Sequence, residues 1–186
     1  MTRNISTLAD IVTELARIQQ AVVSLTDGMS QQQFFHETET RWSPAGYLKH
    51  LILSIKPVAK ALALPPTRIL SLFGAPAQPS RSYDQIVSAY STRLAEGIRA
   101  EDYENVTPGF FRLPAGTTDE QRYLIDTWND SNTRLITAAE AWAEADLDTH
   151  QLPHPAIGAV TVREMLYFTI YHNTLHWRDI EASTTV

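Results

Sequence analysis

Apolar side chains recur every three or four positions along several long stretches of this chain, and this spacing constrains its fold more than any other feature. An α-helix makes one turn in about 3.6 residues, so side chains at this spacing form one stripe that must be buried against neighbouring elements. The pattern predicts helices over residues 6–25, 43–64, 82–102, 117–145 and 161–180. The stripe of the first stretch comprises Leu8, Ile11, Val12, Leu15, Ile18, Val22 and Leu25.

Local sequence signals indicate where some of these helices begin and where one is disturbed. Ser43 fits an N-cap, because its hydroxyl can accept a backbone N–H, and Pro44 fits the first helical turn, where no N–H is needed. Residues 117–120 and 161–164 both have the capping-box pattern, in which Thr and Glu bond reciprocally to the backbone. Pro57 is expected to kink or end the second helix. If the helix bends there instead of ending, it continues to about residue 64.

Proline and glycine separate the helical stretches. Residues 65–80 hold four prolines and Gly74, and we expect a long crossover there with a short turn at residues 68–73. Residues 146–160 contain two prolines and a glycine and predict a loop. No strand pattern and no internal repeat stand out. The sequence therefore predicts one all-α domain over residues 1–186, a four-helix bundle with a long crossover between its second and third helices.

Composition excludes several kinds of function. Of the 186 residues, 44% are hydrophobic, which suffices for the core of a single globular domain. The net charge is -6 and no basic run is visible, so we expect no nucleic-acid partner. There is no cysteine, which excludes disulfides, thiolate metal sites and cysteine nucleophiles, and any thiol chemistry would need an external thiol.

The usual signals for export and membrane insertion are missing. The N-terminal residues 1–5 lack the apolar core of a signal peptide, and no apolar run approaches the length of a membrane span. We therefore expect a cytoplasmic protein with no membrane partner.

Three histidines are the strongest candidates for a functional site. His172 and His176 lie four residues apart in the last predicted helix, so both imidazoles leave the same face and can reach one metal ion. This pair alone is a weak signal, but His50 lies on or beside the apolar stripe of another predicted helix. Because an imidazole in a helical core needs a hydrogen-bond partner or a metal, the sequence predicts that the three converge on a divalent transition metal. A hydrogen-bonded histidine cluster without metal is the alternative.

The ligand types limit the metal and the chemistry. Three neutral nitrogens suit Zn, Ni, Co, Fe or Cu better than Mg or Ca, and they leave positions for water, as catalytic sites do. Asn173 stands where the zincin motif has its glutamate base, and no Glu precedes a candidate ligand by three residues, as in di-iron bundles. The sequence therefore argues against both of these mechanisms.

Other residues have weaker claims on the site. Asp179 could steady the ring of His176 from the next turn, with an ordinary exposed charge as the alternative. Tyr47 could aim its hydroxyl at the site, although core packing is the more common fate of such a tyrosine. His154, in the loop before the last helix, could lie at the mouth of the site, whereas His36 is expected to be solvated.

Several of these features occur together in a known family. In order along the chain they are Trp42, Ser43 and Pro44, then His50, Ser82 and Tyr83, residues 154–164, and the pair His172 and His176. With this ordered set the chain resembles the DinB/YfiT-like superfamily over nearly its whole length. The resemblance implies a four-helix bundle with right-handed, up-down-down-up connectivity.

The resemblance also implies a three-histidine metal site, which maps onto His50, His172 and His176 with water completing the coordination. The metal in relatives is often Zn or Ni, and many relatives are homodimers. Characterised relatives include transferases and isomerases that use low-molecular-weight thiols such as bacillithiol or mycothiol, and others are described as metal-dependent hydrolases. Members differ most in the segment that corresponds to residues 65–80, so the substrate is not implied.

Together, the residues and the resemblance favour a metal-dependent enzyme that acts on a small-molecule substrate. The ion would lower the pKa of a bound water or thiol. No side-chain general base is evident, which slightly favours a thiol-dependent S-transferase or isomerase over a hydrolase. The alternative is a non-catalytic metal-binding protein or a structural helical bundle.

Overall fold

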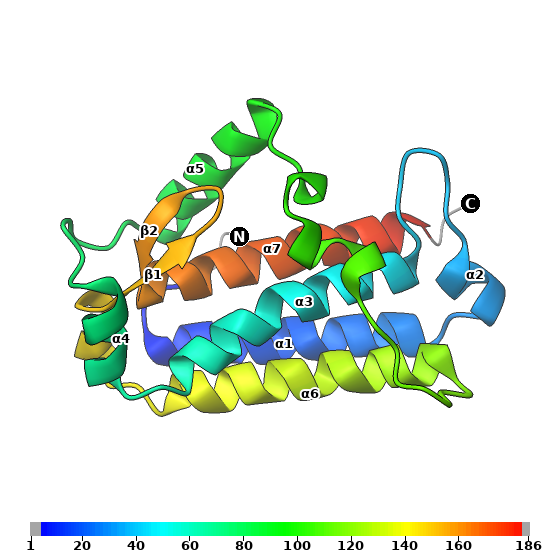
Figure 1. The fold of residues 1–186 in the computed structure, drawn as a ribbon, viewed down its shortest axis with the longest axis horizontal. Coiled ribbons are helices and arrows are strands. Elements are labelled where there is room, and N and C mark those ends of the chain that lie inside the picture. The colour runs from blue at the N-terminus through cyan, green and yellow to red at the C-terminus, as the bar shows by residue number, and fades with distance from the viewer. Residues whose placement is uncertain (1–4, 184–186) are drawn as a thin grey trace.

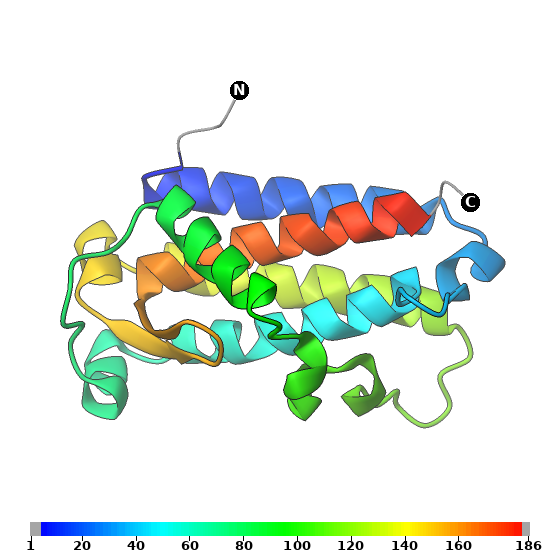
Figure 2. The same cartoon turned by 90° about the horizontal axis from the view of Figure 1, so that it is seen from above.

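Four long helices lie side by side in the computed structural model, which describes residues 5–183 (Figure 1, Figure 2). They are α1 (Leu8–Asp27), α3 (Pro44–Leu62), α6 (Glu120–Glu140) and α7 (Val162–Ser183). Both α1 and α3 pack against α6 and α7, so the four helices form a ring around one core. In Figure 1, α1 and α7 run from left to right, whereas α3 and α6 run from right to left. The chain is predominantly helical, as the sequence predicts.

The core between these helices consists largely of the predicted apolar stripes. The stripe residues of α1 that are completely buried are Ile11, Leu15, Ile18 and Val22. From α6, Trp128 is also completely buried, and its indole N–H donates to the carbonyl of Gln19 at 3.3 Å. Burial of an aliphatic side chain of this size contributes roughly 1.5–3 kcal/mol, so these stripes supply much of the free energy that holds the helices together.

Predicted caps form at the start of α3 and α7, the two helices that carry the candidate histidines. The Ser43 hydroxyl accepts the backbone N–H of Gly46 at 3.1 Å. At α7, the Thr161 hydroxyl accepts the N–H of Glu164 at 3.2 Å, and the Glu164 carboxylate accepts the N–H of Thr161 at 2.9 Å, which is the predicted capping box. Because N–H groups of the first helical turn have no partner within the helix, these bonds fix where both helices begin.

The structure corrects the start of α6 and decides the effect of the proline in α3. α6 begins after Asp119, whose carboxylate accepts a first-turn N–H at 2.9 Å, so the predicted capping box at residues 117–120 is wrong. α3 does not end at Pro57 but continues to Leu62. An interior proline destabilises a helix by about 3 kcal/mol, and burial of Ile55 and Leu62 on either side of it offsets that loss.

The segment between α3 and α6 departs further from the prediction. Residues 65–80 contain a short helix, α4 (Pro66–Phe73), where the sequence predicts a turn. α5 (Tyr83–Ala95) packs on α7 outside the ring and ends before the predicted residue 102, because Gly97 takes a φ of 98° and leaves the helical conformation (Figure 2). The chain then continues in short 3₁₀ turns, η1 (Ala100–Asp102), η2 (Glu104–Val106) and η3 (Pro108–Phe110).

A β-hairpin precedes α7 where the sequence predicts a loop. β1 (Gln151–His154) pairs antiparallel with β2 (Gly158–Thr161). Strands of four residues are too short to show a clear alternation, and Pro153 lowers the strand tendency of the first. Tertiary contacts decide the outcome instead, since Leu152 and its cross-strand partner Val160 are both buried. The prediction of a chain without strands is therefore wrong here.

The shorter elements α2 (Gln31–Phe35) and η4 (Glu144–Asp148) complete the described fold. Within residues 5–183, no helix combines the length and the apolar character needed to cross a membrane. Residues 1–4, which belong to the stretch that argues against a signal peptide, lie outside the described residues, as do residues 184–186.

Candidate metal centre

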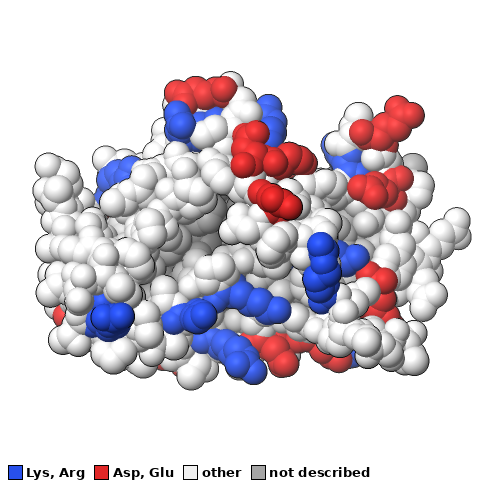
Figure 3. Space-filling model, in the orientation of Figure 1, with Lys and Arg blue, Asp and Glu red and all other residues white. Residues whose placement is uncertain are grey.

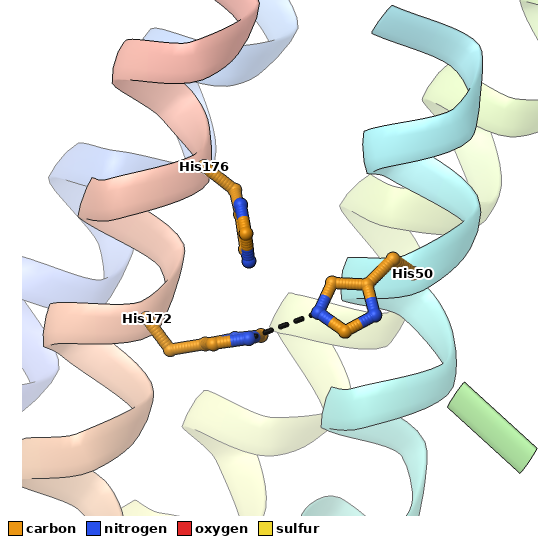
Figure 4. Close-up of side chains that lie close together, drawn as sticks. All are labelled: His50, His172 and His176. Atoms are coloured by element: carbon orange, nitrogen blue, oxygen red, sulfur yellow. Dashed lines mark hydrogen bonds between the residues drawn. The ribbon is translucent and has the colours of Figure 1, made fainter. Parts of the chain in front are cut away.

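The three predicted histidines come together where α3 packs against α7 (Figure 4). His50 projects from α3, and His172 and His176 project from successive turns of α7. One ring nitrogen from each histidine lies within 4.8 Å of the other two. The structure therefore brings together the residues that the sequence selects, and metal binding by them stays a prediction.

The spacing between the ring nitrogens of His50 and His172 suits two ligands of a single ion. The Nε2 atoms of His50 and His172 are 3.0 Å apart and share a hydrogen bond, which the dashed line in Figure 4 marks. Two nitrogens bound to one ion at about 2.0–2.1 Å lie about 2.9 Å apart at a right angle and about 3.3 Å apart at the tetrahedral angle. The observed separation falls between these values, so these two rings fit one ion with little movement.

Hydrogen bonds on the far side of two rings turn their other nitrogens toward the site. His50 Nδ1 donates to the carbonyl oxygen of Val106 at 2.7 Å, because a carbonyl can only accept. His176 Nδ1 donates to the Asp179 carboxylate at 2.9 Å, which is the role suggested for Asp179 from its spacing. With its single hydrogen on Nδ1, each of these rings keeps a lone pair on Nε2 that can bind a metal. Val106 has no sequence signal for this role, because the group that acts is a backbone carbonyl on η2.

Burial keeps the imidazoles of His50 and His172 neutral. His50 is 2% exposed and His172 is 4% exposed. Burial lowers the pKa of His50 to about 4, helped by the nearby His176 and opposed by the hydrogen bond to Val106. Burial also lowers the pKa of His172 well below its usual range. At neutral pH both rings are therefore in the form that binds metal.

Aromatic side chains surround the histidines and restrict how the rings can move. Trp42 packs on His50, with ring centroids 5.3 Å apart, and Phe168 stacks on His172 at 5.1 Å. The Tyr47 ring lies 5.3 Å from the His176 ring, so this tyrosine packs against the site, and burial raises its pKa to about 12.

A family model described as the DinB superfamily matches residues 14–180. This chain belongs to the DinB superfamily. The resemblance predicted from its sequence is thus confirmed. Comparison of this DinB-superfamily protein with curated proteins and with solved structures yields no match.

Within the described part of this DinB-superfamily chain, two cavities of different character meet at the histidines. The first has a volume of about 390 Å³, is lined by His50 and His176, and carries charged side chains of both signs. The second has a volume of about 200 Å³, is lined by His50 and His172, and has mainly apolar walls. Tyr90 of α5 also lines both cavities. Figure 3 shows this face of the molecule hollowed between the β-hairpin and the short turns after α5.

The remaining histidines take different positions. His36 is exposed after α2, as the sequence predicts. His150 is buried against Trp142, with ring centroids 5.4 Å apart, and lines neither cavity at the metal centre. His154 ends β1 and lines the apolar cavity, so it lies beside the centre, as considered from its sequence position.

Proposed function

We propose that this chain is a metal-dependent enzyme in which His50, His172 and His176 hold a divalent zinc or nickel ion. The observation that carries the proposal is the convergence of one nitrogen from each ring, in a buried centre where hydrogen bonds orient two of the rings. We also propose that the four long helices form the up-down-down-up bundle of the family. The ring of helix contacts and the helix directions in Figure 1 support this.

A zinc or nickel ion at this centre would supply a Lewis acid that lowers the pKa of a thiol or a water. The residues of the chain perform the other tasks. Val106 and Asp179 hold two ligand rings in the required tautomer, and Trp42 and Phe168 cover two of the rings with apolar surface. These contacts keep the site preorganised, so little conformational freedom is lost when a ligand binds.

The pair of cavities favours a reaction between two bound molecules. The larger cavity presents Arg41 and Arg99 together with the carboxylates of Glu37, Glu39 and Glu101, which suits a charged or zwitterionic cosubstrate. The smaller cavity suits an uncharged molecule. We therefore propose that the reaction is transfer or isomerisation with a low-molecular-weight thiol, which must come from outside because the chain has no cysteine. Hydrolysis is the second candidate. It ranks lower because it needs only water and one substrate, which would leave the charged cavity without a ligand.

Zinc binding tests the first part of the proposal. Protein purified without a histidine tag should take up about one equivalent of zinc or nickel. At a free zinc concentration of about 100 times Kd, the free energy of unfolding should rise by about 2.7 kcal/mol, which is about 7 °C in Tm for a chain of 186 residues. His50→Ala should abolish the shift, and His36→Ala, at an exposed histidine, should preserve it. An unchanged shift in His50→Ala would refute the proposed ligand set.

Thiol binding tests the second part. Bacillithiol, mycothiol or glutathione should perturb the visible spectrum of the cobalt- or nickel-substituted protein, because a change of ligand alters the ligand field of these ions. If none of the three changes the spectrum, hydrolysis becomes the better proposal. The homodimer expected from the resemblance stays a prediction, and sedimentation equilibrium would test it.

A further inference from the structure

His154 occupies a distinctive position in the apolar cavity beside the metal centre. It is the last residue of β1, and it is 7% exposed. Its ring packs edge to face against the rings of Phe168 and Tyr90, with centroids 4.1 Å and 6.1 Å apart. These contacts fix the orientation of the imidazole on the wall of the cavity that also contacts His50 and His172.

Backbone hydrogen bonds determine which nitrogen of His154 carries the proton. Nδ1 accepts the N–H of Ala156 at 3.1 Å and the N–H of Ile157 at 3.2 Å. An N–H can only donate, so Nδ1 has no hydrogen, and in the neutral ring the hydrogen lies on Nε2. Among the described residues, none accepts a hydrogen bond from Nε2. A buried imidazole that lines the cavity thus keeps an N–H donor without a partner among the described residues.

The rest of the cavity carries little charge. Its walls include apolar side chains such as Val58, Ile98 and Met165, and none of the described residues that line it is acidic. Burial lowers the pKa of His154 to about 4 and raises the pKa of Tyr90 to about 12, so both are neutral at pH 7. Arg99 is exposed, and its guanidinium donates to the backbone carbonyls of Leu94, near the end of α5, and of Ile98.

We propose that this cavity binds an uncharged, mainly apolar molecule with a hydrogen-bond acceptor such as a carbonyl oxygen, and that His154 Nε2–H donates to that acceptor. A polar ligand atom in an apolar cavity loses its hydration, so a donor fixed in the cavity wall favours molecules that place an acceptor next to it. A neutral imidazole can polarise a carbonyl without losing its proton.

The proposal rests on the proposed function for the identity of this molecule as the second substrate. His50 and His172 line the same cavity, so a bound molecule lies next to the proposed ion as well as next to His154. Binding in the cavity does not itself require the ion, and the two proposals can therefore fail separately.

Two matched probes test the donor. Acetophenone and ethylbenzene are close in size, and acetophenone has a carbonyl where ethylbenzene has a methylene. Their affinities are to be measured by ligand-observed NMR on the metal-free and the zinc-loaded full chain. The readout is the ratio of the two Kd values, because it cancels changes in the shape of the cavity that affect both probes.

Two substitutions separate the donor from the structural role of His154. In His154→Asn the amide oxygen takes the place of Nδ1, so it can still accept the N–H groups of residues 156 and 157, but nothing reaches the position of Nε2. In His154→Gln the amide nitrogen reaches that position and keeps a donor there. His154→Asn should raise the ratio of the acetophenone Kd to the ethylbenzene Kd by about threefold to tenfold relative to the wild type. His154→Gln should change this ratio by less than about twofold.

Three results would overturn the proposal. They are an unchanged Kd ratio in His154→Asn, an equal change of the Kd ratio in His154→Asn and His154→Gln, and no binding of either probe to the wild type. If the ratio behaves as expected in metal-free protein while zinc does not bind, the proposed function fails and the binding role of His154 stands. Circular dichroism on each variant establishes that the compared proteins are folded.

Discussion

Acid should destabilise the metal-free protein through His154. Burial holds the pKa of this ring at about 4 in the folded state, against 6.5 for an ordinary histidine. Below pH 6.5 the unfolded chain therefore binds a proton at this position that the folded protein does not bind until about pH 4. The contribution of His154 to stability is thus complete above pH 6.5 and is lost as the pH falls toward 4.

The size of the effect follows from the difference between these two pKa values. Each pKa unit corresponds to about 1.36 kcal/mol, so a change from 6.5 to about 4 corresponds to about 3 kcal/mol. About 2.5 kcal/mol of this should be lost by pH 4.5. That loss is a large share of the roughly 5–15 kcal/mol by which most domains are stable.

Urea unfolding of metal-free protein, followed by tryptophan fluorescence between pH 7.5 and pH 4.5, measures the effect. The wild type should lose about 2.5 kcal/mol more over this range than His154→Asn, because His50 and His172 are present in both proteins and their contributions largely cancel, with His154 only the smallest of the influences on His172. His36→Asn, at an exposed position, should follow the wild type. Parallel curves for the wild type and His154→Asn would refute the reasoning, since they would mean that the ring of His154 is not kept neutral by the fold.

Three further predictions concern the metal centre and the fold. Asp179→Asn should weaken zinc binding about tenfold to 100-fold in a chelator competition, because its carboxylate accepts the N–H of the proposed ligand His176 at 2.9 Å, and a change below twofold would contradict that role. Trp128→Ala should lower the free energy of unfolding by about 3–5 kcal/mol, and a loss under about 1 kcal/mol in urea would show that this completely buried ring is not tightly packed. Gly74→Ala should lower the free energy of unfolding by about 1–3 kcal/mol in thermal unfolding, because Gly74 has a φ of 73°. In the control Gly109→Ala the new methyl group meets open space, so stability should hardly change, and equal effects of the two substitutions would argue against backbone strain at Gly74.

Local interactions explain why much of the helical structure could be predicted. The spacing of an apolar stripe and the fit of a helix cap depend on residues within one or two helical turns of each other. Both the stripe of α1 and the cap at Ser43 are present in the structure. Strands β1 and β2 were not predictable in this way. Four-residue strands have little local preference, and their burial depends on α4, which packs against β1 from a distant part of the sequence, and on α7, which packs against both strands.

The sequence by itself determined the helical class, the family, and the pair His172 and His176 on one face of a helix, because four residues along a helix fix that relation locally. His50 was selected from its apolar surroundings, but only the packing of α3 against α7 places it 3.0 Å from His172. The tertiary structure alone decided the rest: the carbonyl of Val106 as a partner, two cavities of opposite character, and the free N–H of His154. A backbone carbonyl, the shape of a cavity and the tautomer of a buried ring all depend on contacts between residues far apart in the chain, and no local pattern records them.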